Sequence, residues 1–277
     1  MFARLAARLL PPPALRFIGR LQYRVPVLGP LIRRAAGRVA TGEGVIRYGV
    51  GTGLRFQGDG AVAGYLLGTS EPELQEAFAE RIRPGDTVYD LGANIGFYMI
   101  LAARLVGPTG RVVAFEPFPA TAAAARHNAR LNAFDQVHVI EAAVADRPGE
   151  EWLMTGTGPV TFRLGEDREQ PGQLVPVISV DAFVSTAEEP PPDFVKIDVE
   201  GAEERVLLGM KDTLRQHRPT VLCEVHYAIS DFAGFVAREL GPLGYTATRI
   251  DGDGIPEAGA RFHVVLTPLS EPITSTT

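Results

Sequence analysis

Cysteine and long hydrophobic runs are the scarcest features of this chain. Cys223 is the only cysteine among 277 residues, which excludes an intrachain disulfide and a cysteine-rich zinc site. Because a single cysteine is compatible with a reducing compartment, we expect a cytoplasmic protein. The sequence contains no stretch of about 18 uncharged apolar residues, so it predicts no transmembrane helix.

Acidic side chains are absent from the first 40 residues, which hold eight arginines. The other residues carry 19 basic against 33 acidic side chains, and this acidity argues against a nucleic-acid substrate. We expect short helices at 2–10, 14–23 and 28–39. Their arginines form either a solvated face or a basic surface for peripheral contact with anionic lipid or a phosphorylated substrate. Three prolines at 11–13 argue against a signal peptide.

The turn after the first long apolar strand lacks the glycines of a dinucleotide fingerprint. Counting from Gly92, the third position is Asn94 and the sixth is Phe97, where G-x-G-x-x-G requires glycine. Asp90 adds a negative charge two residues before Gly92, and this charge would repel a phosphate. The turn is therefore a poor pyrophosphate cradle.

The same turn has the features of a site for an adenosine ligand without phosphate. Gly92 and Gly96 allow close approach of the backbone. Glu116 follows the next strand, twenty residues after Gly96, where an acidic side chain can accept both ribose hydroxyls. Asp90 would suit an ammonium group, so the pattern favours S-adenosylmethionine. The alternative is a buried aspartate that caps the following helix in an ordinary α/β protein.

Strands and helices alternate through most of the chain, which predicts a parallel α/β sheet. The expected strands are 44–49, 53–56, 87–91, 111–115, 137–141, 177–180, 194–197, 220–225, 245–250 and 262–267, the last two as an antiparallel pair. The expected helices are 70–82 with Ser70 as N-cap, 96–106, 120–132, a brief helix from Asp181, 202–217 with a break near Gly209, and 231–240.

Three parts are expected along the chain. An N-terminal extension of helices and short strands covers residues 1–66, a cofactor-binding domain covers 67–268, and a disordered tail covers 269–277. Within the domain, residues 147–175 interrupt the alternation. They predict a β-hairpin insertion or a flap on the substrate side.

Four acidic residues follow four different predicted strands. Open α/β sheets bind ligands outside the carboxyl ends of their strands, so these side chains should line one edge of the sheet: Asp90, Glu116, Asp198 and Glu224. Lys196 either pairs with one of these acids or extends from the sheet edge into solvent.

Five short motifs, in this order and spacing, resemble the FkbM family of S-adenosylmethionine-dependent methyltransferases. The resemblance covers roughly residues 68–230, with Ser70 and Met99 departing from the residues frequent in the family. The motifs are Asp-Leu-Gly-Ala-Asn-Ile-Gly at 90–96, Phe-Glu-Pro at 115–117, Ser-Val-Asp at 179–181, Val-Lys-Ile-Asp-Val-Glu-Gly at 195–201 and Glu-Val-His at 224–226.

The resemblance implies a class I methyltransferase fold, which is a doubly wound, mostly parallel sheet with an antiparallel edge strand. Its strand order would be 3-2-1-4-5-7-6. The family transfers methyl groups to hydroxyl oxygens, often of a sugar, glycan or natural product. By position in the motifs, the cofactor would contact Asp90, Gly92, Ala93, Asn94 and Gly96 with its methionine part, Glu116 with its ribose, Glu141 and Ala142 with its adenine, and Asp198 with its amine.

A hydroxyl acceptor must lose its proton during methyl transfer, which calls for a general base. His226 is the first candidate because its ordinary pKa suits neutral pH; the alternative is a histidine at the surface or at the core edge without a catalytic role. Asp198 is the second candidate; by the resemblance it would face either the cofactor amine or the acceptor. Glu200 and Glu224 would orient His226 or bind the acceptor. Asp198, Glu224 and His226 could also converge on a Mg²⁺ ion.

Two other functions remain open from the sequence. One is a non-catalytic module that keeps the cofactor fold, and the other is an NAD(P)-dependent oxidoreductase, against which Asp90 and the missing glycine argue. Tyr98 is expected to serve helix packing. Glu71 either reaches the cofactor from its helix or, as is commoner, is an exposed carboxylate in the first turn. His263 carries no functional signal.

Overall fold

The computed structural model describes residues 42–58, 63–155, 162–165, 169, 171–186, 189–227, 229–256, 259 and 261–269. The arginine-rich segment with its three expected helices lies outside these residues, as do residues 270–277 of the expected tail. Within the described part of the chain, no helix is both long and apolar enough to cross a membrane.

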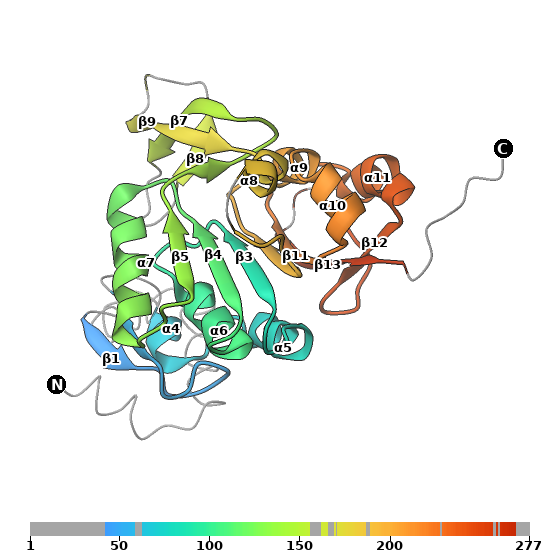
Figure 1. Cartoon of the computed structure of the whole chain (residues 1–277). Coiled ribbons are helices and arrows are strands. Elements are labelled where there is room, and N and C mark those ends of the chain that lie inside the picture. Colours follow the sequence, from blue (N-terminus) through green and yellow to red (C-terminus); the bar gives the residue numbers. More distant parts are fainter. Residues whose placement is uncertain are drawn as a thin grey trace, which may run out of the picture.

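A seven-stranded sheet forms the centre of the fold (Figure 1). Its strands, in spatial order, are β5 (Val137–Ile140), β4 (Arg111–Phe115), β3 (Thr87–Leu91), β10 (Phe194–Ile197), β11 (Thr220–Val225), β13 (Phe262–Pro268) and β12 (Tyr245–Arg249). All pairs from β5 to β11 are parallel. Counted along the chain, this is the expected order 3-2-1-4-5-7-6. The antiparallel strand, β13, lies between β11 and β12, one place in from the edge.

Side chains of each strand alternate between two hydrophobic cores, as the pleat of a β-strand requires. Val88 and Leu222 face one core, whereas Tyr89 and Cys223 face the other. Helices cover both faces, with α5 and α6 on one side and α8–α10 on the other (Figure 1). The bounds are α5 Pro72–Arg81, α6 Phe97–Val106, α7 Pro119–Leu131, α8 Val180–Thr186, α9 Glu203–Leu208, α10 Lys211–His217 and α11 Phe232–Phe235.

The expected break near Gly209 is confirmed, since α9 and α10 are separate helices on either side of it. A Cβ at Gly209 would lie 2.3 Å from the carbonyl oxygen of Ala145. Glycine therefore allows the helical segment to touch the backbone that follows β6 (Ala143–Val144). Further along, α11 continues directly into a π-helical turn, Val236–Leu240.

The prediction of Ser70 as N-cap of α5 is wrong. The cap is Glu71, in a left-handed conformation with φ 44° and with no side-chain cap hydrogen bond. Proline at the first helical position explains the shift, because Pro72 fixes the start of the helix. The backbone carbonyl of Ser70 instead accepts a hydrogen bond from Gln75 Nε2 at 2.6 Å.

The described part of the N-terminal extension packs onto α7. The two expected short strands are present as an antiparallel pair, β1 (Glu43–Val45) and β2 (Arg55–Gln57). A helix that was not expected, α4 (Ala63–Leu67), follows them. Asn128 of α7 accepts a hydrogen bond from the backbone N–H of Gln57 at 2.7 Å, and Asn132, the C-cap residue of α7, accepts one from the N–H of Arg55 at 2.8 Å.

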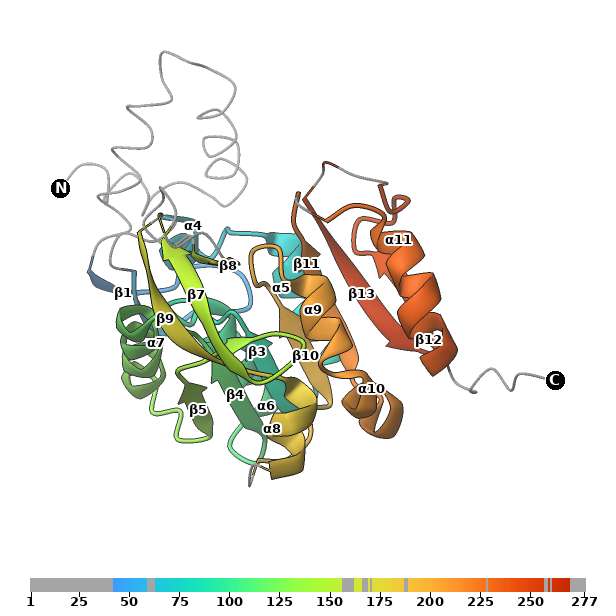
Figure 2. The same ribbon diagram turned by 90° about the horizontal axis from the view of Figure 1, so that it is seen from above.

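The hairpin predicted within residues 147–175 is confirmed as part of a separate four-stranded sheet (Figure 2). Beside β6 it contains β7 (Gly149–Thr155), β8 (Phe162–Gly165) and β9 (Gly172–Ile178). The sheet begins just after β5, at the carboxyl end of the main sheet. Arg205 of α9 ties it down through Asp146 Oδ1 at 2.7 Å and Glu151 Oε2 at 2.8 Å.

Candidate active site

The turn between β3 and α6 is a backbone cradle that tolerates no side chain at Gly92. A Cβ there would lie 1.9 Å from the carbonyl oxygen of Asp198, and φ is +83°. The N–H groups of Gly92 and Ala93 both donate to the carbonyl oxygen of Phe115 at 3.0 Å. The end of β4 therefore holds the turn directly against the chain that leaves β10.

Lys196 is a buried cation that contacts the carboxylates at the ends of β3 and β10. Its Nζ lies 3.0 Å from Asp90 Oδ1 and 3.4 Å from Asp198 Oδ2, and it donates to the Gly92 carbonyl at 3.3 Å. Burial alone would lower the pKa of Lys196, but the two carboxylates raise it well above its ordinary value. The expected pairing of Lys196 with an acid is thus confirmed.

Asp90 is almost fully buried, with 1% of it exposed. Burial raises its pKa, against the opposing charge of Lys196. Among the described residues, no hydrogen-bond donor reaches Asp90 Oδ2. Asp90 therefore has one oxygen committed to the protein and a second that is buried and unpaired.

Glu116 closes β4 and braces the glycine turn. Its Oε2 accepts the N–H of Asn94 and its Oε1 accepts the N–H of Phe118, both at 3.0 Å. Burial raises the pKa of Glu116 to about 7, although these two hydrogen bonds oppose the shift. Each carboxylate oxygen keeps a further lone pair, so the side chain can still accept ribose hydroxyls.

The two residues predicted to border adenine lie after β5. Ala142 is buried, whereas Glu141 is exposed and paired with Arg126 of α7. Arg126 also donates to the carbonyl oxygen of Val139 at 2.9 Å. The contact of Glu141 and Ala142 with adenine stays a prediction.

His226 stands directly after β11 and is only 7% exposed. Its Nδ1 lies 2.7 Å from Glu203 Oε1. On the other side of the ring, Nε2 lies 3.4 Å from Glu200 Oε2 and 3.8 Å from Asp198 Oδ1. Burial lowers the pKa of His226, but the hydrogen bond with Glu203 and the three negative charges outweigh it and raise the pKa overall.

A second polar cluster lies beside this histidine. Glu224, at the end of β11, is ion-paired with Arg261. His263 Nε2 lies 3.6 Å from Glu224 Oε2 and 3.7 Å from Glu71 Oε1, and the Tyr98 hydroxyl donates to Glu71 Oε2 at 2.8 Å. Burial lowers the pKa of His263. The cluster therefore offers hydrogen-bond donors and acceptors side by side.

The residues considered for a metal do converge. One ligand atom from each of Asp198, Glu224 and His226 lies within 4.8 Å of the other two, and Glu71, Glu224 and His263 form a similar set. However, Lys196 lies beside Asp198 and Arg261 beside Glu224. Protein cations therefore already balance the carboxylates that a Mg²⁺ ion would need.

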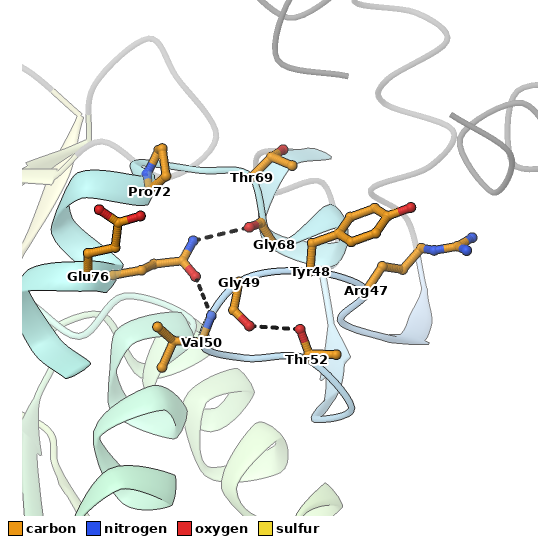
Figure 3. Close-up of a pocket in the computed structure, with 10 residues that line it drawn as sticks. Arg47, Tyr48, Gly49, Val50, Thr52, Gly68, Thr69, Pro72 and Glu76 are labelled. Atoms are coloured by element: carbon orange, nitrogen blue, oxygen red, sulfur yellow. Dashed lines mark hydrogen bonds between the residues drawn. The ribbon is translucent and has the colours of Figure 1, made fainter. Parts of the chain in front are cut away.

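A hollow of about 390 Å³ lies between the turn that follows β1 and the start of α5 (Figure 3). Gln75 spans one side, accepting from the N–H of Val50 at 3.2 Å and donating to the Gly68 carbonyl at 3.4 Å. The hollow contains none of the predicted site residues, and Gln75 uses its amide to hold loops together.

The structure brings most predicted site residues to one edge of the sheet, at the carboxyl ends of β3, β4, β10 and β11. These residues are Asp90, Gly92, Ala93, Asn94, Gly96, Glu116, Asp198, Glu200, Glu224 and His226. Sequence reasoning missed Glu203 and the functional setting of Tyr98, Arg261 and His263. For Glu71 it offered only a contact with the cofactor. Only Glu203 had a usable signal, since it stands two residues beyond the Lys-Ile-Asp-Val-Glu-Gly motif.

The sequence profile of the methyltransferase FkbM domain matches residues 90–247, which include the glycine turn, Glu116, Asp198 and His226. The chain belongs to the FkbM methyltransferase family. This establishes a methyltransferase of an S-adenosylmethionine-dependent family, as the five motifs indicated.

Two other methyltransferases and a solved structure are similar to this chain over most of the domain. It is 30% identical over 212 residues to 31-O-demethyl-FK506 methyltransferase FkbM of Streptomyces tacrolimicus, covering 62% of this chain and 81% of that protein. It is 28% identical over 160 residues to hexuronic acid methyltransferase AglP of Haloferax volcanii, covering 57% and 64%. A solved FkbM methyltransferase from Methylobacillus flagellatus aligns with 74% of this chain and 53% of its own, at 15% identity and a TM-score of 0.44.

Proposed function

We propose that this enzyme methylates a hydroxyl oxygen of a sugar, glycan or hydroxylated natural product. The observation that carries the proposal is His226, a nearly buried histidine with Nε2 turned toward Asp198 and Glu200 at the ligand-binding edge of the sheet. A hydroxyl needs a base to accept its proton, and a histidine in this place can supply one.

The names of two relatives support this class of acceptor. One is a 31-O-demethyl-FK506 methyltransferase, which acts on an oxygen of a natural product, and the other is a hexuronic acid methyltransferase. Neither name fixes the acceptor of this chain. Together they favour a small hydroxylated molecule or glycan over a nucleic acid.

The residues at the ends of β3 and β4 fit S-adenosylmethionine. The space above Gly92 is closed to any side chain, Asp90 Oδ2 is a buried acceptor without a partner among the described residues, and Glu116 can accept ribose hydroxyls. Asn94 and Gly96 complete the turn, in left-handed conformations with φ of 51° and 84°.

When bound, S-adenosylmethionine supplies a methyl group whose bond to sulfur breaks as a bond to the acceptor oxygen forms, and one proton must leave that oxygen. His226 Nε2 receives this proton. Glu203 and Asp198 stabilise the resulting imidazolium by their charge, and Glu200, which is 40% exposed, leads from Nε2 toward solvent. The residues around the site also align the acceptor with the cofactor, and this alignment supplies the rest of the rate acceleration.

The acceptor is held, in this proposal, by the cluster of Glu71, Glu224, Arg261 and His263. Carboxylates accept hydrogen bonds from hydroxyl groups, and the guanidinium and imidazole donate to them. Contacts of 3.6 to 3.7 Å between His263 and its two carboxylate neighbours are too long for direct hydrogen bonds. They leave the polar atoms available to a hydroxyl-rich ligand.

Metal assistance is the weaker form of this mechanism. Because Lys196 and Arg261 already balance Asp198 and Glu224, we expect the rate to be unchanged when EDTA is added. A rate that is lost with EDTA and restored by Mg²⁺ would assign Asp198, Glu224 and His226 as metal ligands instead.

The test is to locate the transferred methyl group. The enzyme is incubated with S-adenosylmethionine labelled with ¹³C in its methyl group and with methyl glycosides of hexoses and hexuronic acids. We expect the label to appear as a methoxy carbon in NMR spectra. Binding of NAD in place of S-adenosylhomocysteine, or bound cofactor with no transfer to any hydroxyl, would favour the oxidoreductase or the non-catalytic module.

A further inference from the structure

Glu203 is the most deeply buried carboxylate at the edge of the sheet that carries the candidate site, with 0% of its side chain exposed. It opens α9, two residues after Gly201, whose N–H donates to Glu203 Oε1 at 2.9 Å. The same oxygen lies 2.7 Å from His226 Nδ1. One carboxylate oxygen therefore joins the loop after β10 to the histidine after β11.

This arrangement fixes the proton on the imidazole ring. An ionised carboxylate only accepts hydrogen bonds, so the nitrogen facing it must carry hydrogen. In neutral His226 that nitrogen is Nδ1, which leaves the lone pair on Nε2. Among the described residues, no hydrogen-bond donor occupies Nε2.

The groups around Nε2 point to a reason for this tautomer. Asp198 and Glu200 present carboxylate oxygens to it from the segment after β10. If Nε2 carried the hydrogen, these acceptors would hold it and the ring would have no basic nitrogen for the acceptor. Glu203 opposes that outcome from the far side of the ring.

We propose that Glu203 is a positioning residue, which holds His226 in the tautomer with a free Nε2 and orients that nitrogen toward the acceptor hydroxyl. The inference rests on the proposed function for the identity of the acceptor group. It adds a residue to which sequence reasoning gave no role, and a defined path for the proton. The hydroxyl proton moves to Nε2, while the proton on Nδ1 stays in its hydrogen bond with Glu203.

Two substitutions separate the roles of the carboxylate. Glu203→Gln keeps a carbonyl oxygen that can accept from Gly201 and from Nδ1, but it removes the charge. Glu203→Met keeps a similar length and removes the acceptor altogether. Glu204→Gln is the matched control, because Glu204 is the next residue of the same helix and is partly exposed.

The first readout is the ¹⁵N spectrum of the histidine rings in mildly alkaline solution, with the His226 signals assigned by their loss in His226→Gln. We expect a protonated Nδ1 and an unprotonated Nε2 in the wild type, in Glu203→Gln and in Glu204→Gln. In Glu203→Met we expect this preference to be lost. A wild type that carries hydrogen on Nε2, or a Glu203→Met protein with the wild-type pattern, would overturn the proposal.

The second readout is turnover of the methyl glycoside acceptors. Glu203→Met should lower kcat by about 100-fold or more, within the range that a general base supplies, with the acceptor KM and the affinity for S-adenosylhomocysteine unchanged. Glu203→Gln should recover part of that loss. Equal losses in kcat for Glu203→Met and Glu204→Gln would contradict a positioning role.

The two readouts keep this inference distinct from the proposed function. The ring spectrum needs no acceptor, so the expected tautomer can be found even if no hydroxyl is methylated, and then only the proposed function fails. Conversely, transfer to oxygen together with the wrong tautomer leaves the function in place and removes Glu203 from it. Circular dichroism of the two Glu203 variants identifies any loss of fold, and the wild-type spectrum decides the tautomer without them.

Discussion

At the scale of single residues, the glycine turn is restricted by the atoms with which an added Cβ would clash. Gly92 and Gly107 both have positive φ, at 83° and 67°. A Cβ at Gly92 would meet the Asp198 carbonyl oxygen, whereas a Cβ at Gly107 has nothing within 4 Å. The two positions therefore separate backbone strain from a backbone clash.

Gly92→Ala should abolish binding of S-adenosylhomocysteine and lower the free energy of unfolding by more than about 2 kcal/mol, since the clash involves two backbones. Gly107→Ala should cost only backbone strain, about 1–3 kcal/mol, because φ 67° with ψ −172° is a conformation that is almost restricted to glycine, and it should keep the affinity. Calorimetric titration and thermal unfolding measure both effects. Wild-type affinity in Gly92→Ala would show that the turn is not part of the cofactor site.

The side chain of Glu116 should make both the stability of the protein and its affinity for the cofactor depend on pH. Its folded pKa, about 7, is above its ordinary value because of burial. The protonated form therefore dominates below pH 7, and its contribution to the stability of the ligand-free protein is lost as pH rises through 7. Affinity for the ribose should change in the opposite direction, because the ionised form accepts both hydroxyls.

We expect the affinity for S-adenosylhomocysteine to fall as pH is lowered from 8 to 6, by up to about tenfold per pH unit below the pKa. Calorimetric titration across this range measures the slope. Glu116→Gln should bind weakly at every pH and show a much flatter profile. The same slope in Glu116→Gln would assign the titration to another group.

The sequence predicted those site residues whose place depends on a strand and its end. Asp90, Glu116 and Asp198 each follow a short apolar run, and parallel strands carry such residues to one edge. Glu203 and Glu71 were not predictable in the same way. Their roles depend on contacts between the start of a helix and the end of a distant strand. Such tertiary contacts cannot be read from the local sequence.

At the scale of elements, the Ser-Val-Asp motif proves to be a link between helices. Asp181, near the start of α8, accepts the N–H of Thr213 at 2.7 Å and the N–H of Asp212 at 3.0 Å through its two oxygens. The Thr213 hydroxyl also donates to it at 2.7 Å. Asp181 therefore caps α10 from a neighbouring helix.

Asp181→Ala should lower the free energy of unfolding by about 1–2 kcal/mol, as loss of a helix cap does, and leave cofactor affinity unchanged. Asp212→Ala is the control. Its exposed side chain pairs only with Arg215 in the described part of the chain, so it should cost a few tenths of a kcal/mol. Chemical denaturation measures both, and equal effects would contradict the capping role.

Periodicity predicted the elements better than it predicted their ends. The run at 202–217 reads as one helix with a weak point, and Gly209 breaks it because the backbone near Ala145 lies so close. At α5, Ser70 has the composition of an N-cap, but Pro72 and the left-handed Glu71 set the start. Both outcomes follow from contacts with distant parts of the chain.

At the scale of the whole molecule, the doubly wound sheet gathers charges that are far apart in the sequence. Lys196 lies between the acids of β3 and β10, and Arg261 pairs with the acid of β11. The sequence predicted the acidic edge. The neutralising Arg261 precedes the antiparallel strand, β13, and its place beside Glu224 depends on a pairing that the motifs did not reveal.

His226 is the residue to which we assign the hydroxyl proton, so its replacement is the sharpest test of the proposed mechanism. The measurement is the rate of methoxy formation from ¹³C-labelled S-adenosylmethionine, with hexose and hexuronic acid glycosides as acceptors, in wild type, His226→Gln and the exposed-site control His217→Gln. We expect a fall of roughly 10²- to 10⁴-fold in His226→Gln, unchanged affinity for S-adenosylhomocysteine, and a wild-type rate in the control. An undiminished rate in His226→Gln, or label on nitrogen or carbon in place of oxygen, would contradict this mechanism.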